Sequence, residues 1–178
     1  GSIADAVASI TGATESTPWC IMVYPGVYEE PEITIPSFVN ITGITQYAVQ
    51  ITPMTSTQNL FVMNETTSLN FIQLMGVGSG YAGIVAHDVG NYALCHKVSM
   101  VDCDIGWDIK SDAVDSIVYL EYCDTTGGNE AIKIESTNGS TMYSNFENFY
   151  IFASDAGVNP TTGLSVIGPD ATVFLHVF

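Results

Sequence analysis

The chain contains no arginine and only three lysines, against nineteen aspartates and glutamates, so its formal net charge is −16. Such an excess of negative charge repels nucleic acids and anionic membrane surfaces, and it leaves few cationic groups for phosphate contacts. It also disfavours polyanionic sugars unless cations bridge the two. We therefore expect no nucleic-acid partner and no membrane insertion, and we interpret the acidity itself as a source of solubility.

Long apolar runs and paired cysteine motifs are missing as well. No apolar run approaches the roughly 20 residues that a membrane-spanning helix needs. The four cysteines show no CxxC pair and no other metal-ligand spacing, so we expect neither a zinc site nor a disulfide scaffold. Their default interpretation is buried free thiols.

The residues that are present indicate one folded domain. Of 178 residues, 47% are apolar and only 12% are charged, which is a composition that builds a core. Between Cys20 and Ile51 short alternating apolar runs are separated by compact turns, with Pro25-Gly26 forcing a bend. Three strands separated by turns of similar length fit one coil of a solenoid better than a hairpin.

This stretch also carries a family resemblance. The pattern V-x-P-G-x-Y-x-E, then I-x-I, then V-x-I-x-G resembles the first coil of pectin-lyase-like right-handed parallel β-helices, which include pectinesterases and viral spike proteins. It is formed by Val23, Pro25, Gly26, Tyr28, Glu30, Ile33, Ile35, Val39, Ile41 and Gly43. The resemblance implies the fold, an all-β, single-stranded right-handed parallel β-helix, and says little about function.

The same resemblance implies which enzymes to look for. Pectate lyases and pectinesterases depend on a catalytic arginine, and this chain has none. Resemblance to polygalacturonases would require four sequence elements, Asn-x-Asp, Asp-Asp, His-Gly and Arg-x-Lys, and this chain has none of them. The sequence therefore supports the fold without these enzyme assignments.

An irregular repeat strengthens the solenoid prediction. The segments YAGIVAHD, DIGWDIKSD, NEAIKIEST and TTGLSVIGPD align with one another. In this alignment Asp108 and Lys133 point outward one coil apart, at about 4.8 Å, and form a surface pair. A second strand is predicted to recur at 98–100, 118–120 and 149–151, with an earlier copy at Ile72 and Leu74.

The two ends of the chain receive separate predictions. Residues 3–10 place Ile3, Ala6, Val7 and Ile10 on one helical face, so we expect residues 1–18 to form an N-terminal cap and link. Residues 19–178 form the β-helix. The apolar strand 172–178 has no polar cap after it, which predicts a longer native chain or a partner subunit at that edge.

Carboxylates give the first site hypotheses. Each predicted second strand is followed by an acid-ended step, Asp102-Cys103-Asp104, Tyr122-Cys123-Asp124 and Ala153-Ser154-Asp155. Asp102, Asp104 and Asp124 are the candidate catalytic residues of a polysaccharide hydrolase, with His87 or His96 as a neighbour. The alternative is that these aspartates accept hydrogen bonds from backbone N–H groups in turns.

The same alignment suggests two further sites. Asp104, Asp124 and Asp155 would stack at about 4.8 Å and repel one another unless hydrogen bonds or a hard cation such as calcium intervene. No other cofactor is expected. Cys103 and Cys123 would lie on neighbouring coils within disulfide distance, with two stacked thiols as the alternative.

Tyrosines give a binding hypothesis. Tyr119, Tyr122, Tyr143 and Tyr150, together with Phe146 and Phe149, are candidates for a sugar-stacking platform, although core or subunit packing explains such residues equally well.

From these features we expect a non-enzymatic structural or receptor- or glycan-binding module of a virion or cell surface, such as a spike, fibre or capsid component. It would be a homo-oligomer, with a trimer about the solenoid axis, or part of a larger surface assembly. A polysaccharide hydrolase and a secreted carbohydrate-binding module are the alternatives.

Overall fold

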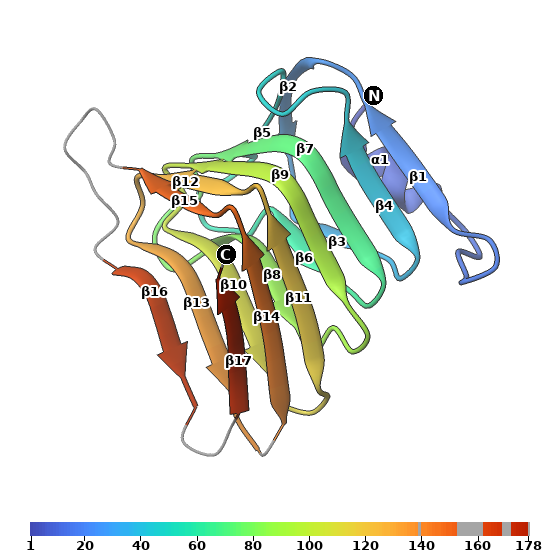
Figure 1. Cartoon of the computed structure of the whole chain (residues 1–178). Coiled ribbons are helices and arrows are strands. Elements are labelled where there is room, and N and C mark those ends of the chain that lie inside the picture. The colour runs from blue at the N-terminus through green and yellow to red at the C-terminus, as the bar shows by residue number, and fades with distance from the viewer. Residues whose placement is uncertain (139, 153–161, 169–171, 178) are drawn as a thin grey trace.

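The computed structural model describes residues 1–138, 140–152, 162–168 and 172–177, the last of these as backbone only. It is a right-handed parallel β-helix, as the first-coil motif predicts, in which successive coils stack from the N-terminal to the C-terminal end (Figure 1). The paired strands run parallel throughout this part of the chain. None of the helices in the described ranges has the length and apolar character that would let it cross a membrane.

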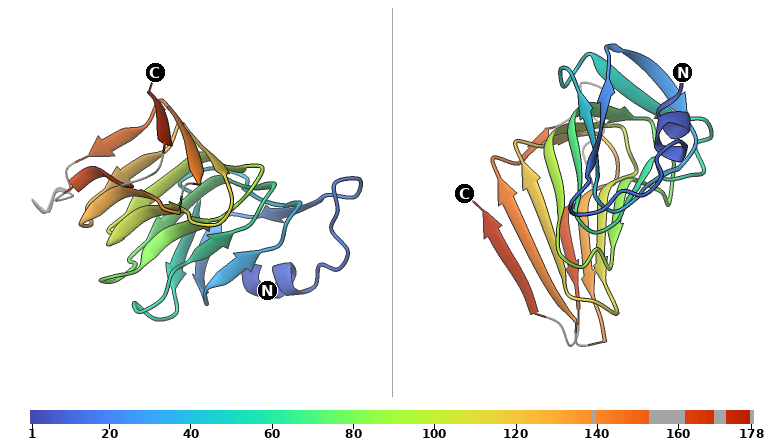
Figure 2. Two further views of the ribbon diagram at one scale, coloured as in Figure 1. Left: turned by 90° about the horizontal axis from the view of Figure 1, so that it is seen from below. Right: turned by 90° about the vertical axis from the view of Figure 1, so that its right-hand side faces the viewer.

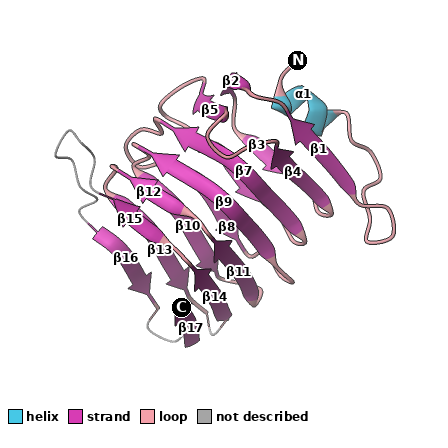
Figure 3. Ribbon diagram, turned by 45° about the horizontal axis from the view of Figure 1, so that its top comes forward, coloured by secondary structure: helices cyan, strands magenta, loops and turns pink. Residues whose placement is uncertain are grey.

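Two sheets enclose the core. The six-stranded sheet takes one strand from each coil, in the order β3 (Ile33–Ile35), β6 (Phe61–Met63), β8 (Ala82–His87), β10 (Ile105–Ser111), β13 (Glu130–Ser136) and β16 (Thr162–Ile167). The eleven-stranded sheet follows the path β1 (Trp19–Val23), β4 (Val39–Gly43), β7 (Thr67–Met75), β9 (Ala93–Val101), β11 (Ser116–Glu121), β14 (Thr141–Glu147) and β17 (Thr172–Val177). Off this path β2 (Gly26–Glu30) pairs with β5 (Val49–Pro53) and β5 with β7, while β12 (Asp124–Thr126) pairs with β9 and with β15 (Tyr150–Phe152). Almost all of the described chain is strand or turn (Figure 3).

The larger sheet bends at the same point in four successive coils. Phe71, Lys97, Tyr122 and Asn148 all have left-handed backbone conformations, with φ between 51° and 55°. Strand register places them one above another, because Ile72 pairs with Val98, and Ser99 and Tyr150 both pair with Asp124. In each of these coils, one non-glycine residue therefore adopts the unfavourable left-handed conformation and turns the chain from one face of the solenoid to the next.

The repeat in the second half of the chain is confirmed. Trp107 pairs with Ile84 and Ile132, and Ile132 pairs with Leu164, as the alignment of the four segments predicts. Trp107 and Ile109 are fully buried. The early copy of the second strand is confirmed too, since Ile72 and Leu74 pair with Val98 and Met100.

The predicted alignment of the second strands is wrong at one copy. Residues 118–120 pair with residues 93–95 in the first half of β9, whereas residues 98–100 pair with β12 and, through it, with β15. Each coil carries two strand segments in this region, on either side of the left-handed bend. Both segments end near an acidic residue. The sequence alignment therefore matched the first segment of one coil with the second segment of its neighbour.

The N-terminal helix covers one end of the stack (Figure 2). Helix α1 (Ile3–Ala8) is shorter than the predicted residues 3–10 and buries Ile3 and Val7 against the first coil. The carboxylate of Glu30, itself 1% exposed, accepts hydrogen bonds from the backbone N–H groups of Ile3 at 2.6 Å and Ala4 at 3.1 Å. A buried acid on β2 thus satisfies two of the free donors that every helix N-terminus leaves.

Candidate functional site

The three aspartates proposed as catalytic lie in different places. Asp102 is exposed at the bend after β9, where the lack of a side chain at Gly127 leaves room for its carboxylate. Asp104 holds the next turn: its Oδ2 accepts from the Gly80 N–H at 2.6 Å, and its Oδ1 accepts from Asn129. Asp104 therefore serves a neighbouring turn, as the structural alternative predicts.

Asp124 occupies a different face, on the outer side of β12. Register places its side chain in a polar column with Gln50, Gln73 and Ser99. Its Oδ1 accepts from Ser99 Oγ at 2.7 Å, and its Oδ2 accepts from Gln46 Nε2 at 3.2 Å. Gln46 belongs to the loop between β4 and β5, so this loop reaches past β7 and β9 to contact a strand 78 residues later in the chain.

The surroundings of Asp124 change its acidity. Burial raises the pKa of Asp124 above the ordinary value of 3.8, and hydrogen bonds from Ser99, Gln46 and Tyr47 lower it without cancelling the effect of burial. Burial and the nearby charge of Asp124 also raise the pKa of Tyr47. Asp124 is therefore a half-buried carboxylate with a raised proton affinity on a polar outer surface.

The predicted aspartate stack and disulfide are wrong in register. Asp124 pairs with Ser99 and Tyr150 rather than with Asp104, and Asp155 lies outside the described residues. Cys103 and Cys123 are buried free thiols that donate to backbone carbonyls, Cys103 to Leu74 at 3.7 Å and Cys123 to Cys95 at 3.4 Å. Within the described part of the chain, no group of three or more His, Cys, Asp or Glu residues is placed to hold a metal ion.

The four tyrosines do not form one platform. Tyr122 lies at the bend, edge-on to His96 with ring centroids 5.6 Å apart, and Tyr150 stacks on Phe152 beyond the bend. Tyr119 and Tyr143 lie on the outer face of β11 and β14, in adjacent columns of side chains. Tyr143 lines a cavity on this face, and Tyr92, which sequence reasoning missed, lines the adjoining one.

The two adjoining cavities form a lateral groove. A cavity of about 620 Å³ is lined by Asn91 and Tyr92 together with Glu15, Pro18, Phe38, Asn40 and Thr66. A second cavity, of about 470 Å³, shares Asn91 and is lined by Tyr143 together with Glu65, Gly90, Val114, Asp115 and Ile117. We refer to the two adjoining cavities as the lateral groove.

The groove follows the stacking direction because its floor is a register column. Thr66 donates its N–H to the Tyr92 carbonyl, Ala93 pairs with Val118, and Ile117 pairs with Tyr143. Tyr92, Ile117 and Tyr143 are thus the residues of three successive coils, with Tyr92 40% and Tyr143 44% exposed. Neither tyrosine belongs to an apolar repeat segment, and only the register puts them in one line.

Polar contacts fix the wall of the groove. The turn that precedes Asp115 is held by Asp88, whose Oδ1 accepts from the N–H groups of Asp112, Ala113 and Val114 at 2.7, 2.9 and 3.3 Å. Burial alone would raise the pKa of Asp88, but these three donors outweigh it and lower the pKa. The wall therefore rests on a turn that three hydrogen bonds to one carboxylate hold in place.

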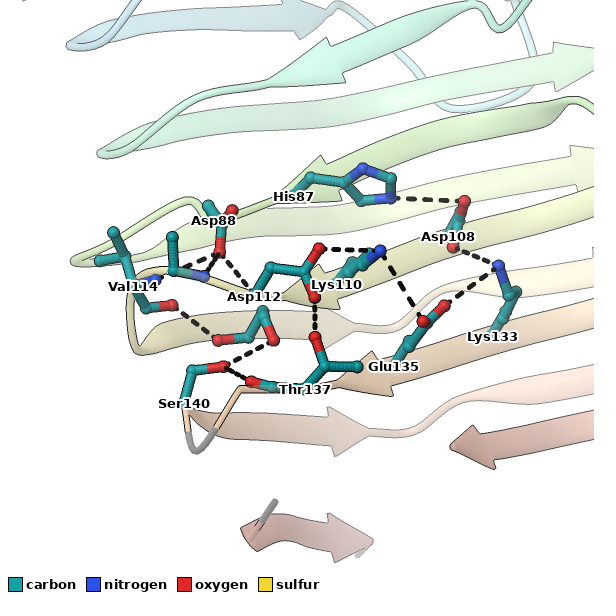
Figure 4. Close-up of polar contacts among 12 residues, drawn as sticks. His87, Asp88, Asp108, Lys110, Asp112, Val114, Lys133, Glu135, Thr137 and Ser140 are labelled. Atoms are coloured by element: carbon teal, nitrogen blue, oxygen red, sulfur yellow. Dashed lines mark hydrogen bonds and ion pairs between the residues drawn. The ribbon is translucent and has the colours of Figure 1, made fainter. Parts of the chain in front are cut away.

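Most of the positive charge lies elsewhere, on the outer face of the six-stranded sheet (Figure 4). Lys133 Nζ lies 3.4 Å from Asp108 Oδ1, which confirms the predicted surface pair. His87 Nε2 lies 3.3 Å from the other oxygen of Asp108, and Lys110 Nζ lies 2.8 Å from Asp112. Burial would raise the pKa of Asp108, but the bonds and charges of His87 and Lys133 reverse this and lower it. This charge ladder uses two of the three lysines to tie β8, β10 and β13 together.

Comparisons with known proteins find likeness in structure alone. No family model matches the chain, and no curated protein matches its sequence. The solved pectin methylesterase PemA from Erwinia chrysanthemi superposes with a TM-score of 0.62 at 15% identity, covering 87% of this chain and 63% of that one. A pectin methylesterase in complex with a hexasaccharide superposes with a TM-score of 0.58 at 14% identity, covering 94% of this chain and 62% of that one. The pectin methylesterase from Yersinia enterocolitica superposes with a TM-score of 0.57 at 13% identity, covering 95% of this chain and 66% of that one. The chain thus spans less than two thirds of the length of these proteins, and at this identity the likeness is one of fold, the pectin-lyase-like parallel β-helix.

Proposed function

We propose that this chain is a non-enzymatic glycan-binding module in which an extended oligosaccharide lies along the lateral groove. The observation that carries the proposal is the pair of half-exposed tyrosines, Tyr92 and Tyr143, two coils apart on one register column. Aromatic rings pack against the apolar faces of sugar rings, while amide and carboxylate groups bind hydroxyls. Asn91, Glu65 and Asp115 supply such groups beside the rings.

The groove runs in the direction that a polymer requires. Because every coil adds about 4.8 Å, the three coils from Tyr92 to Tyr143 repeat a contact position at a fixed interval. A rigid sheet holds these positions before binding, which reduces the ordering cost of association. Glycan affinity then comes from several weak, equally spaced contacts.

The test is a binding measurement with matched variants. Titration calorimetry against a panel of neutral, anionic and cationic hexasaccharides should detect binding that Tyr143→Ala weakens at least tenfold. Tyr24→Ala removes a tyrosine that is 68% exposed and lies outside the groove, and it should leave affinity unchanged. Equal losses in the two variants, or no binding by the parent chain, would contradict the proposal.

A polysaccharide hydrolase is the second candidate, and one observation favours it. The raised pKa of the half-buried Asp124 suits a proton donor. Asp102 lies against Gly127, which follows Asp124 by three residues in the chain, so the two aspartates are roughly 10 Å apart along the sheet. Mass spectrometry of oligosaccharides after incubation decides this point: water-added fragments that disappear with Asp124→Asn would establish the hydrolase.

The setting that we propose is a virion or cell surface, with several copies of the chain in one assembly. Exposed apolar side chains on β15, namely Tyr150, Ile151 and Phe152, offer a contact surface for assembly. Sedimentation velocity over a range of concentrations tests the oligomer, and a chain that stays monomeric at high concentration contradicts it.

A further inference from the structure

The charges that line the lateral groove are of one sign. Glu15, Glu65 and Asp115 are exposed carboxylates on its walls. Among the described lining residues there is no lysine: Lys97 lies over the Phe71 ring, and Lys110 and Lys133 belong to the charge ladder. The chain has no arginine to supply a cation from elsewhere.

These carboxylates keep much of their hydrogen-bonding capacity. Asp115 accepts one bond, from the Thr141 N–H to Oδ1 at 2.6 Å. Glu65 Oε2 accepts a long bond from Asn91 Nδ2 at 3.4 Å. Since an ionised carboxylate has about four acceptor sites, both groups can accept further donors from a ligand.

Aromatic and acidic positions repeat at the same interval. Tyr92 and Tyr143 are two coils apart, and the turns that carry Glu65 and Asp115 are also two coils apart, so each pair repeats at about 10 Å. In an extended β-1,4-linked glycan one sugar residue advances by nearly the height of one coil, and every second residue presents the same face. A ring contact and an acidic contact therefore recur once for every two sugars.

We propose that the lateral groove selects a cationic oligosaccharide, a β-1,4-linked chain of amino sugars. Its ring faces pack on Tyr92 and Tyr143, and its ammonium groups contact Glu65 and Asp115. This inference rests on the proposed glycan-binding function and adds the charge class of the ligand.

The spacing and the charge argue against other occupants. A uronic-acid chain brings carboxylates towards Glu65 and Asp115, where like charges repel. In an extended lysine peptide, side chains on one face recur at about 7 Å, which does not match the interval of about 10 Å between the acidic turns. Such a peptide also lacks flat apolar faces for the two tyrosine rings.

The experiment compares four probes by titration calorimetry at low salt: a glucosamine hexamer, cellohexaose, a galacturonate hexamer and hexalysine. We expect the glucosamine hexamer to bind about three- to thirtyfold more tightly than cellohexaose, because two exposed ion pairs contribute modestly. Added salt should reduce this advantage, as it does for exposed charges.

Two variants locate the charge effect. Glu65→Gln and Asp115→Asn remove charge but keep an acceptor oxygen, which for Asp115 preserves the bond from Thr141. Each should weaken glucosamine binding about threefold and leave cellohexaose binding unchanged. Glu29→Gln removes the same charge from an exposed position outside the groove and should change neither.

The outcomes separate the two proposals. If cellohexaose binds as tightly as the glucosamine hexamer, and Tyr143→Ala abolishes both, glycan binding stands and the cationic specificity is overturned. Hexalysine binding as tight as that of the glucosamine hexamer would also overturn it, since charge alone would then explain the affinity. If no oligosaccharide binds, both proposals fail.

Discussion

Glu30 gives the sharpest test of how this solenoid is closed at its N-terminal end. Its carboxylate is 1% exposed and bonds the N–H groups of Ile3 and Ala4, the first two residues of α1. The change Glu30→Ala removes both acceptors and leaves the donor of Ile3 buried without a partner. The helix then loses its main polar attachment to β2.

The expected loss of stability follows from these two bonds. A hydrogen bond to a charged group contributes about 1.5–3 kcal/mol, so two contribute at least about 3 kcal/mol, including the favourable placement of an anion at a helix N-terminus. The loss cannot greatly exceed the free energy that holds α1 in place, because the helix can undock and expose Ile3 and Val7. For a chain of this size, about 3 kcal/mol lowers the melting temperature by about 6–12 °C.

Thermal unfolding followed by circular dichroism measures this shift. Glu29→Ala is the matched control, since it removes the same charge from the neighbouring, exposed position on β2 and should shift the melting temperature by less than about 2 °C. Glu30→Gln keeps one acceptor and should lie between the two. If Glu30→Ala melts within about 2 °C of Glu29→Ala, the buried carboxylate does not hold the helix and the reasoning is refuted.

Three further predictions concern charge and thiols. Because the pKa of Asp124 is raised in the folded state, ionisation of this carboxyl destabilises the fold as the pH rises above about 4. Asp124→Asn should therefore melt at a higher temperature than the parent chain at neutral pH, and the difference should close below about pH 4. A lower melting temperature of the variant at neutral pH would contradict this. The pKa of Asp108 is lowered in the folded state, so its ionised form stabilises the fold above about pH 4, and this stabilisation is lost as the pH falls through the lowered pKa. Asp108→Asn should cost about 1 kcal/mol at neutral pH. A cost that does not decrease as the pH falls below about 4 would count against the charge ladder. Burial raises the pKa of Cys95 and of Cys103 to about 12, which keeps these thiols protonated and unreactive. A thiol reagent should therefore modify one cysteine in the native chain, the exposed Cys20, and all four cysteines after denaturation. Labelling of fewer than four cysteines after denaturation would indicate a disulfide.

Repeat periodicity determined the fold. The first-coil motif and the alternation of buried and outward residues predicted parallel coils, and they also predicted the pair of Asp108 with Lys133. Such predictions succeed because strand alternation is local: a residue two positions along the strand returns to the same face whatever the rest of the chain does. The absence of arginine is equally a property of the sequence alone.

Only the tertiary structure decided which residues meet across coils. A bend divides each coil of this region into two strand segments, and it lies at Phe71, Lys97, Tyr122 and Asn148. These four residues are of four different types, so no common residue type identifies the bend in the sequence. Aligning the acid-ended steps across the bend placed Asp124 beside Asp104 and Cys123 beside Cys103, whereas the true register places Asp124 beside Ser99. The loop contact from Gln46 to Asp124 and the column from Tyr92 to Tyr143 depend on the same register. Backbone hydrogen bonding between coils fixes that register, and it acts between residues more than twenty positions apart, beyond the range of any local pattern.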